Sequence, residues 1–352
     1  IAEDNDNHIW FGTANGVYIL DKRDYSIHPV TSDKIGDSEC EALIALHDGT
    51  VWISMNHNLL HLDSEEKGLQ SISTLNRKLH GKYANSFYED SQDNLWLLEN
   101  GGAVCRYDKS RKCFVPYGSE TINLQRMVED NSNGCYWMAT WGGGIYKFIP
   151  NTLGSDAIFE HQEATSVAGN PDGTKAEIID LLLDKSNKTL WVTAMDGLHA
   201  YRIVNGSLVE SNLDGFLPEG KNIVDRMFLD MKGNIWVSAF SPHTFMIARS
   251  DTVMRRNRMN DILVKTGNSV IGDFAITDRN MLWLWDPRIG LELHDLTHFM
   301  TALGTDQPDD SQMHGSGVIT PISGGSGFWM ASPDQILHLN NEGMRIVRTP
   351  FA

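Results

Sequence analysis

Eight tryptophans recur along the chain at nearly regular intervals, and this feature constrains the fold more than any other. The intervals between successive members run from 41 to 54 residues, and the series uses eight of the ten tryptophans of the chain. A repeat of this length is typical of proteins built from one supersecondary unit used many times. The eight positions are Trp10, Trp52, Trp96, Trp137, Trp191, Trp236, Trp283 and Trp329.

An aspartate stands four to seven residues before seven of these tryptophans, usually among Asn, Gly, Ser or Lys. Residues of this kind favour tight turns, so each tryptophan is predicted to lie on a strand that follows a turn. An apolar strand such as 177–183 precedes the turn, a third strand such as 197–203 follows, and a more polar fourth strand ends the unit. The seven aspartates are Asp4, Asp48, Asp90, Asp130, Asp184, Asp230 and Asp278.

Four short strands in each unit, without a window of comparable helical period, predict an all-β fold. Many such units in series are typical of a β-propeller of four-stranded antiparallel blades around a channel. Residues 1–352 are therefore predicted to form a single propeller, with one blade centred on each repeated tryptophan. Each repeated indole, including that of Trp137, is expected to pack between neighbouring blades with its N–H satisfied locally.

Composition and charge exclude several classes of protein. With 46 acidic and 29 basic residues the net charge is −17, which repels phosphate backbones, so nucleic acid binding is not expected. No stretch approaches the roughly 20 apolar residues of a membrane helix, and the first residues do not resemble a signal peptide, so any such segment is expected outside this chain. The thirteen histidines show no metal-binding spacing, and the segment DNDN at 4–7 lacks the features of a calcium loop, so no metal or cofactor is predicted.

Two of the four cysteines flank a predicted hairpin, AVCRYDKSRKCFV. A turn near 108–111 would place Cys105 opposite Cys113 across the two strands. Two interpretations remain open at this point: a cross-strand disulfide, and two reduced, half-buried thiols.

Three segments carry a longer pattern that resembles a known family. YEDSQDNLWLLENGGAVCRYD, VEDNSNGCYWMATWGGGIYKF and LDMKGNIWVSA closely resemble the two-component-regulator propeller repeat. That repeat builds the extracytoplasmic sensor of hybrid two-component proteins in gut bacteria that degrade polysaccharides. The resemblance implies a periplasmic domain that senses an oligosaccharide and has no catalytic activity of its own.

The resemblance also implies partners that lie outside this chain. Proteins of the family carry a second propeller, an immunoglobulin-like module, a membrane helix and a histidine kinase or other output, and they are expected to signal as homodimers. The family's propellers usually have seven blades, whereas eight repeats are counted here. Either the ring has eight blades, or one terminal repeat belongs to a neighbouring propeller.

Polar residues recur at the start of the first strand in several units. Buried strands favour apolar side chains, so polar groups at one level in several blades indicate a solvated channel mouth where a ligand could bind. Alternatively, the acidic members pair with the arginines or hold channel water. Aligned on the terminal aspartate of the strand, one column holds Asn85, Gln125, Asp225 and Asp273, and the next holds Arg126, Asp180 and Arg226.

The loops between second and third strands are expected at the same mouth. TWGGG contains Trp141, AFSPHT contains His243, and WDPRIG contains Trp285 and Arg288. Glycines 142–144 allow a tight turn that leaves Trp141 clear of its sheet, where an indole could stack on a sugar ring. Trp141 could instead shield its own turn, and Trp285 could widen one blade interface.

If Arg126, Arg226 and Arg288 converge, they would suit a carboxylate or sulfate, which suggests an acidic oligosaccharide. Two other functions compete with sensing. A propeller hydrolase or lyase would need two carboxylates at a defined separation, and Asp180, Asp225 and Asp273 could supply them. A protein-interaction or dimerisation platform is the third interpretation, and a ligand between two propellers is a further alternative.

Overall fold

A computed structural model describes the chain in two parts. The structure describes residues 2–24, 26–30, 38–55, 58–62, 73–74, 84–151, 157–162 and 177–213, and beyond them the strands between 224 and 350. Internal contacts divide the chain into two compact units, Ile1–Ile178 with Val204–Leu208, and Ile179–Ile203 with Val209–Ala352. No helix long and apolar enough to cross a membrane occurs among the described residues.

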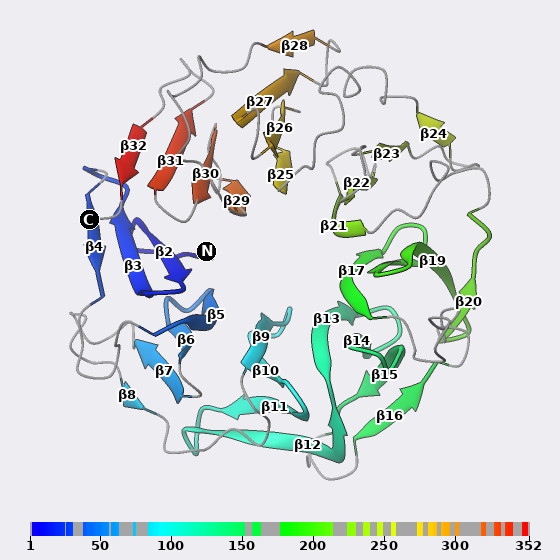
Figure 1. The fold of residues 1–352 in the computed structure, drawn as a ribbon. Helices are drawn as coiled ribbons and strands as arrows, with labels where there is room; N and C mark the ends of the chain where they lie inside the picture. The colour runs from blue at the N-terminus through cyan, green and yellow to red at the C-terminus, as the bar shows by residue number, and fades with distance from the viewer. Residues whose placement is uncertain are drawn as a thin grey trace. The chain divides into compact units, whose positions relative to one another are not determined.

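The first unit contains four sheets, each of four strands in chain order (Figure 1). The strands of the first two sheets are β1 (Ala2–Glu3), β2 (His8–Thr13), β3 (Gly16–Asp21) and β4 (Ile27–Pro29), then β5 (Cys40–Ala45), β6 (Val51–Met55), β7 (Asn58–Leu62) and β8 (Ser73–Thr74). Those of the next two are β9 (Ala84–Glu89), β10 (Leu95–Glu99), β11 (Gly102–Asp108) and β12 (Cys113–Ile122), then β13 (Leu124–Asp130), β14 (Cys135–Thr140), β15 (Ile145–Ile149) and β16 (Ile158–His161).

The remaining sheets repeat the same order, and the first of them has residues in both units. It consists of β17 (Ile178–Asp184), β18 (Thr189–Ala194), β19 (Gly197–Val204) and β20 (Ser207–Glu210). The next consists of β21 (Val224–Leu229), β22 (Ile235–Ala239), β23 (Phe245–Ala248) and β24 (Arg255–Asn257). The last two are β25 (Asp273–Ile276), β26 (Met281–Asp286), β27 (Gly290–Asp295) and β28 (Met300–Ala302), then β29 (Val318–Pro321), β30 (Gly327–Ala331), β31 (Gln335–Asn340) and β32 (Val347–Pro350).

Every repeated tryptophan lies on the second strand of its sheet, as the repeat predicts. Repeated four-stranded antiparallel sheets are the units from which β-propellers are built, so the all-β prediction is confirmed at this level. Six of the eight indoles are at most 1% exposed, and the side chains of the other two lie outside the described residues. The six are Trp10, Trp52, Trp96, Trp137, Trp191 and Trp236.

The buried indoles pack between neighbouring sheets within each unit. In the first unit Trp10 packs with residues of β6 and β7, and Trp52 with residues of β9, β10 and β11. Trp96 contacts the aromatic ring of Phe148 in β15, with the centroids 5.5 Å apart. In the second unit Trp191 packs with residues of β21 and β22. The expected role of the repeat in sheet-to-sheet packing is therefore confirmed for these four.

The aspartate of the turn has a second role that turn chemistry alone does not predict. Its carboxylate accepts a hydrogen bond from the indole N–H of its own repeat in three sheets of the first unit. The donor–acceptor distances are 2.7 Å for Trp10 and Asp4, 2.8 Å for Trp96 and Asp90, and 3.1 Å for Trp137 and Asp130.

Two indoles depart from the expectation that the N–H is satisfied locally. The buried Nε1 atoms of Trp52 and Trp191 have no hydrogen-bond partner. Asp48 stands only four residues before Trp52, and its carboxylate accepts from Thr50 and Lys109 instead. The carboxylate of Asp184, seven residues before Trp191, accepts from Ser186 and Asn187. In both cases the carboxylate accepts from donors in or near the turn and not from the indole.

The hairpin of β11 and β12 forms as predicted, but its cysteines do not face each other. Cys105 lies opposite Pro116, and Cys113 lies opposite Asp108. None of the four cysteines forms a disulfide. The disulfide interpretation is wrong here because the turn of the hairpin is displaced from the one that would align the two thiols.

We expect two of the thiols to resist alkylation. Burial raises the pKa of Cys40 and of Cys135 to about 12, and the reactive form of cysteine is the thiolate. In the folded chain at pH 8, iodoacetamide is expected to label the partly exposed Cys113 and to leave Cys40 and Cys135 unmodified. Peptide mass spectrometry, with the unfolded chain as the fully labelled control, measures this. Rapid labelling of Cys135 would contradict its burial.

Candidate ligand-binding site

The turn between β14 and β15 presents one indole to solvent. Trp141 is 44% exposed, in contrast to the fully buried Trp137 four residues earlier. Gly142 and Gly144 adopt positive φ angles of 79° and 78°, which only glycine adopts without strain. The hydroxyl of Thr140 donates to the Gly144 carbonyl at 2.7 Å and closes the turn. The predicted exposure of Trp141 is confirmed.

The backbone of Trp141 is held on two sides. Its N–H donates to the Asn123 carbonyl at 2.8 Å, next to the start of β13, and the residue forms an isolated antiparallel bridge with Glu177. A Cβ on Gly143 would lie 2.5 Å from the Thr140 hydroxyl, so this turn also excludes a larger residue there. The indole is thus carried by a fixed turn, which limits the entropy lost when a ligand stacks on it.

The starts of β9 and β13 lie side by side in the first unit. The Asn85 amide donates to the Leu124 carbonyl, and the Ser86 hydroxyl donates to the Gln125 carbonyl at 3.1 Å. The exposed Arg126 side chain donates to the same carbonyl at 3.2 Å. Asn85, Gln125 and Arg126, which the sequence places in two adjacent columns, are therefore brought to one end of these sheets.

Several of the polar residues at the start of the first strand occupy β-bulges. The strand register shifts between Leu98 and Glu99, which leaves Asn85 as the extra residue of β9, and a shift between Leu124 and Arg126 does the same for Gln125. In β21 the shift surrounds Asp225. Bulges redirect side chains and are over-represented beside functional sites.

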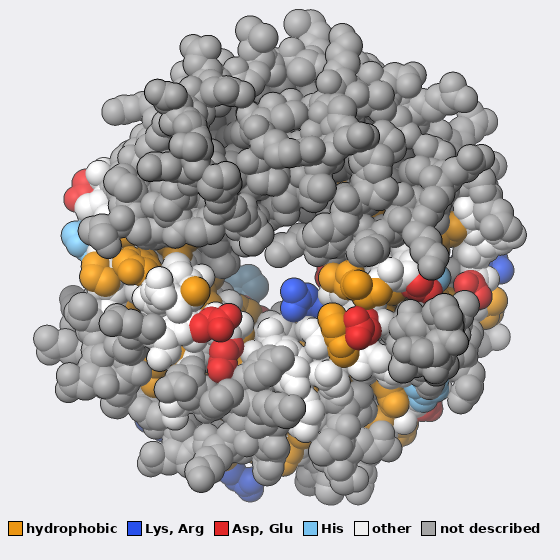
Figure 2. Space-filling view, viewed as in Figure 1, with side chains coloured by type: hydrophobic (Ala, Val, Ile, Leu, Met, Phe, Trp, Pro, Cys, Tyr) orange, Lys and Arg blue, Asp and Glu red, His pale blue; other side chains and the backbone are white. Residues whose placement is uncertain are grey.

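The bulge identifies one residue that the sequence alignment missed. In β5 the register shifts between Cys40 and Ala42, so Glu41 occupies the same structural position as Asn85 and Gln125. Its carboxylate accepts a hydrogen bond from the Ser54 hydroxyl at 2.6 Å. Acidic side chains, in red, gather near β5 on the face drawn in Figure 2. The sequence does contain a signal, the polar residue directly after Cys40. The alignment of first strands on their terminal aspartate did not place this residue in either column.

The remaining predicted site residues lie elsewhere along the chain. Asp180 is half-buried in β17, where its carboxylate accepts from the Leu181 N–H at 2.9 Å. Arg226 of β21 lies opposite Ser238 of β22. Asp273 of β25 lies opposite Trp285 of β26, so these two residues share one end of a sheet. His243 and Arg288 lie outside the described residues.

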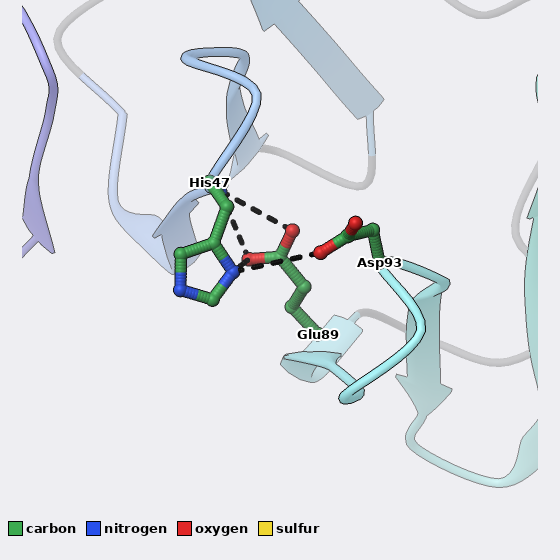
Figure 3. Close-up of side chains that lie close together, drawn as sticks. All are labelled: His47, Glu89 and Asp93. Carbon is green, nitrogen blue, oxygen red and sulfur yellow. Dashed lines mark hydrogen bonds and ion pairs between the residues drawn. The ribbon is translucent and has the colours of Figure 1, made fainter.

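One group of three side chains has the composition of a metal site. His47 Nδ1 lies 3.3 Å from Glu89 Oε2 and 3.8 Å from Asp93 Oδ1 (Figure 3). Nitrogen and oxygen atoms at such separations suit a divalent ion such as Zn²⁺. The His47 ring is 83% exposed, however, and its backbone N–H already donates to both Glu89 oxygens. The group therefore serves as a hydrogen-bonded link between two neighbouring sheets.

The link lies at the turn end of the sheets, away from Trp141. Glu89 is the last residue of β9, whereas Asn85 is near its start. The Ser91 N–H and hydroxyl donate to the Glu129 carboxylate near the end of β13, so β9 and β13 run side by side in the same direction. This pair of sheets thus has a turn end that carries Asp90 and Asp130 and an opposite end that carries the bulges at Asn85 and Gln125 and the exposed Trp141.

Comparison with known proteins identifies the fold of the chain but does not identify a family. No protein-family model matches the chain, and no curated protein matches it. The extracellular domain assigned to the hybrid two component system BT4673 from B. thetaiotaomicron is 15% identical, with a TM-score of 0.56 over 94% of this chain and 50% of that chain. This chain thus spans about half the length of that structure.

Two further solved structures cover most of both chains. AztD from Citrobacter koseri is 11% identical, with a TM-score of 0.60 over 97% of this chain and 92% of that chain. Sqt1 from Saccharomyces cerevisiae is 10% identical, with a TM-score of 0.61 over 97% of this chain and 87% of that chain. Likeness at such low identity concerns the fold alone: this chain shares the fold of an extracellular domain assigned to a hybrid two component system and of these other proteins.

Proposed function

We propose that the chain is the ligand-binding propeller of an extracytoplasmic sensor, and that it recognises an oligosaccharide without cleaving it. Its fold matches an extracellular domain assigned to a two-component system over 94% of its length, and its repeats resemble those of such sensors. In this proposal the eight sheets close into one ring, with each repeated indole between one blade and the next.

The exposed Trp141 on its fixed glycine turn is the observation that carries the proposal. An indole face takes the apolar C–H face of a sugar ring, and nearby polar groups bind the hydroxyls. Asn85 and Gln125 supply amides on bulges at the same end of the first unit, and Arg126 supplies a cation there. Closure of the ring would add the corresponding ends of the second unit, with Asp180, Asp225, Asp273 and Trp285.

The output of the sensor lies outside this chain in the proposal. A second propeller and an immunoglobulin-like module would connect it to the membrane, and a dimer of the whole protein would control a histidine kinase or another regulator. The chain itself would work in the periplasm. A hydrolase or lyase is the alternative that a turnover assay separates from sensing.

Replacement of Trp141 tests the proposed site. We expect at least one oligosaccharide from a panel of neutral and acidic polysaccharide fragments to bind the chain, and Trp141→Ala to weaken its binding about tenfold or more, because the stacked apolar surface is lost. Isothermal titration calorimetry measures the affinity. Ile158→Ala removes an equally exposed apolar side chain from β16 and serves as the control that leaves binding unchanged. Equal affinity in Trp141→Ala and the unchanged chain would refute the site.

A further inference from the structure

A pair of cavities lies at the turn end of the first unit, on the opposite side from Trp141. One has a volume of about 390 Å³ and is lined by the turns before β10 and β14, including Ser91, and by Glu129 of β13. The other has a volume of about 530 Å³ and is lined by the turn of the β11–β12 hairpin. Asn94 and Arg106 line both cavities, and we refer to the two together as the hollow around the Arg106 side chain. Volumes of this order suit a small ligand.

The Arg106 guanidinium is held against two aromatic rings. Its central carbon lies 5.7 Å from the ring centroid of Trp96 and 5.3 Å from that of Tyr117. Both distances are within the range of cation–π attraction, which orients the planar guanidinium. Within the part of the chain that the structure describes, this half-buried cation has no hydrogen bond or ion pair. A guanidinium in a cavity ordinarily pairs with a carboxylate, so the absence of one is unusual.

The carboxylates beside the first cavity are already occupied by neutral donors. The Asp90 carboxylate accepts from the Trp96 indole at 2.8 Å and from the Tyr136 hydroxyl at 2.7 Å. The Glu129 carboxylate accepts from the N–H and the hydroxyl of Ser91, each at 3.0 Å. Neither carboxylate turns toward Arg106 to form an ion pair.

The charged groups of the second cavity also have their own partners. The Asp108 carboxylate accepts from Ser110 and lies 3.6 Å from Arg111, and these contacts hold the pKa of Asp108 below its usual value. Lys109 forms an ion pair with Asp48 at 3.1 Å. Asp93 lies beside His47 in the linking group described above. Arg106 is thus the one cation of the hollow whose charge the described residues leave unmatched.

We propose that Arg106 binds the carboxylate of a uronic acid unit, whose ring and hydroxyls occupy the hollow. The planar guanidinium fork matches a carboxylate with two parallel hydrogen bonds. A single cation between Asp93, Asp108 and Glu129 disfavours the double charge of a phosphate, since each nearby carboxylate repels it. That the ligand is a sugar follows from the proposed function, whereas that it carries an anionic group follows from Arg106 alone. This site is distinct from the one at Trp141.

Titration with matched acidic and neutral sugars tests this site. Galacturonate trimer and galactose trimer differ chiefly in the carboxylates, and the Trp96 indole N–H signal in nuclear magnetic resonance spectra reports contact at Arg106. We expect the galacturonate trimer to shift this signal and the galactose trimer and inorganic phosphate to leave it unchanged. Arg106→Gln is expected to weaken binding of the galacturonate trimer about 10- to 100-fold, the loss typical of a charged hydrogen-bonded pair.

Two variants separate charge from geometry. Arg202→Gln removes an equal charge from the exposed surface of β19 and is expected to bind as the unchanged chain does. Arg106→Lys keeps the charge but not the fork, and is expected to bind more weakly than the unchanged chain. Thermal unfolding of each variant verifies that it is folded.

The outcomes distinguish this inference from the proposed function. An unshifted Trp96 signal with galacturonate trimer, or equal affinity in Arg106→Gln, overturns the carboxylate site whatever happens at Trp141. A shift that depends on Arg106, in a chain that binds no oligosaccharide through Trp141, supports the carboxylate site and refutes the proposed sensor site.

Discussion

Trp137→Ala is expected to lower the free energy of unfolding by about 3–5 kcal/mol, the range for large aromatic residues replaced in a packed core. The Trp137 side chain is fully buried, and its indole N–H donates to Asp130. The substitution leaves a cavity in the fourth sheet and removes the donor that the Asp130 carboxylate uses in its turn. Chemical denaturation followed by circular dichroism measures the change.

Trp141→Ala is the matched comparison for this prediction. It makes the same chemical change four residues away, on a side chain that is 44% exposed. Exposed substitutions rarely change stability by more than about 0.5 kcal/mol. Similar losses in the two variants would mean that the two indoles do not have the separate structural and surface roles described above.

Asp90→Ala is expected to destabilise the chain by a similar amount, about 3–5 kcal/mol, although it removes only a small polar side chain. The Asp90 side chain is 2% exposed and accepts hydrogen bonds from the Trp96 indole and the Tyr136 hydroxyl, which belong to two neighbouring sheets. Without it two buried donors lose their acceptor, and each orphaned group costs about 1–3 kcal/mol. Denaturant unfolding measures this loss.

Asp108→Ala makes the same substitution at an exposed turn of the same sheet. Asp108 accepts mainly from Ser110 and Arg111 within its own turn, so a loss of about 1 kcal/mol or less is expected. If Asp90→Ala were no worse than this control, the aspartate would serve the turn and not the packing between sheets.

The Asp90 carboxylate also makes the free energy of unfolding depend on pH. Burial raises its pKa, but the hydrogen bonds from Trp96, Tyr136 and Asn94 outweigh burial, so the pKa is lowered from the usual 3.8. A carboxyl with a lowered folded pKa contributes its full stability above the unfolded pKa and loses it as the pH falls toward the folded pKa. The free energy of unfolding should therefore fall below about pH 4, and fall less steeply in Asp90→Asn.

The repeat predicted the strands well because their period is local information. One unit alone shows the turn aspartate, the apolar strand with its tryptophan and the glycine that follows. The second strand of every sheet was therefore placed correctly. The glycine turn that exposes Trp141 was predictable for the same reason, since it depends on three adjacent glycines.

Features that depend on how strands pair were not predictable. The bulges at Glu41, Asn85 and Gln125 arise from register between two strands, which a column of aligned letters does not contain. The same reason explains the error at Cys105 and Cys113, where a small displacement of the turn changes the partner of each residue.

Side-chain contacts between strands were equally hidden from the sequence. In the sequence Arg106 is an ordinary residue of a third strand. Its position over the rings of Trp96 and Tyr117 depends on the pairing of three strands of the sheet. The unpaired N–H groups of Trp52 and Trp191 could not be predicted from spacing either, since Asp130 and Asp184 both stand seven residues before their tryptophans and only Asp130 accepts from the indole. The missed features thus depend on tertiary contacts, and the correct predictions depend on local patterns.

The proposed function requires that this chain binds an oligosaccharide and leaves it intact. The most direct test incubates the chain with the oligosaccharide that binds most tightly in calorimetry and then analyses the recovered sugar by chromatography. We predict saturable binding and recovery of the sugar at its original length. Shorter or unsaturated products formed by the purified chain would contradict the claim and would identify an enzyme, and the absence of binding by any member of the panel would contradict it as well.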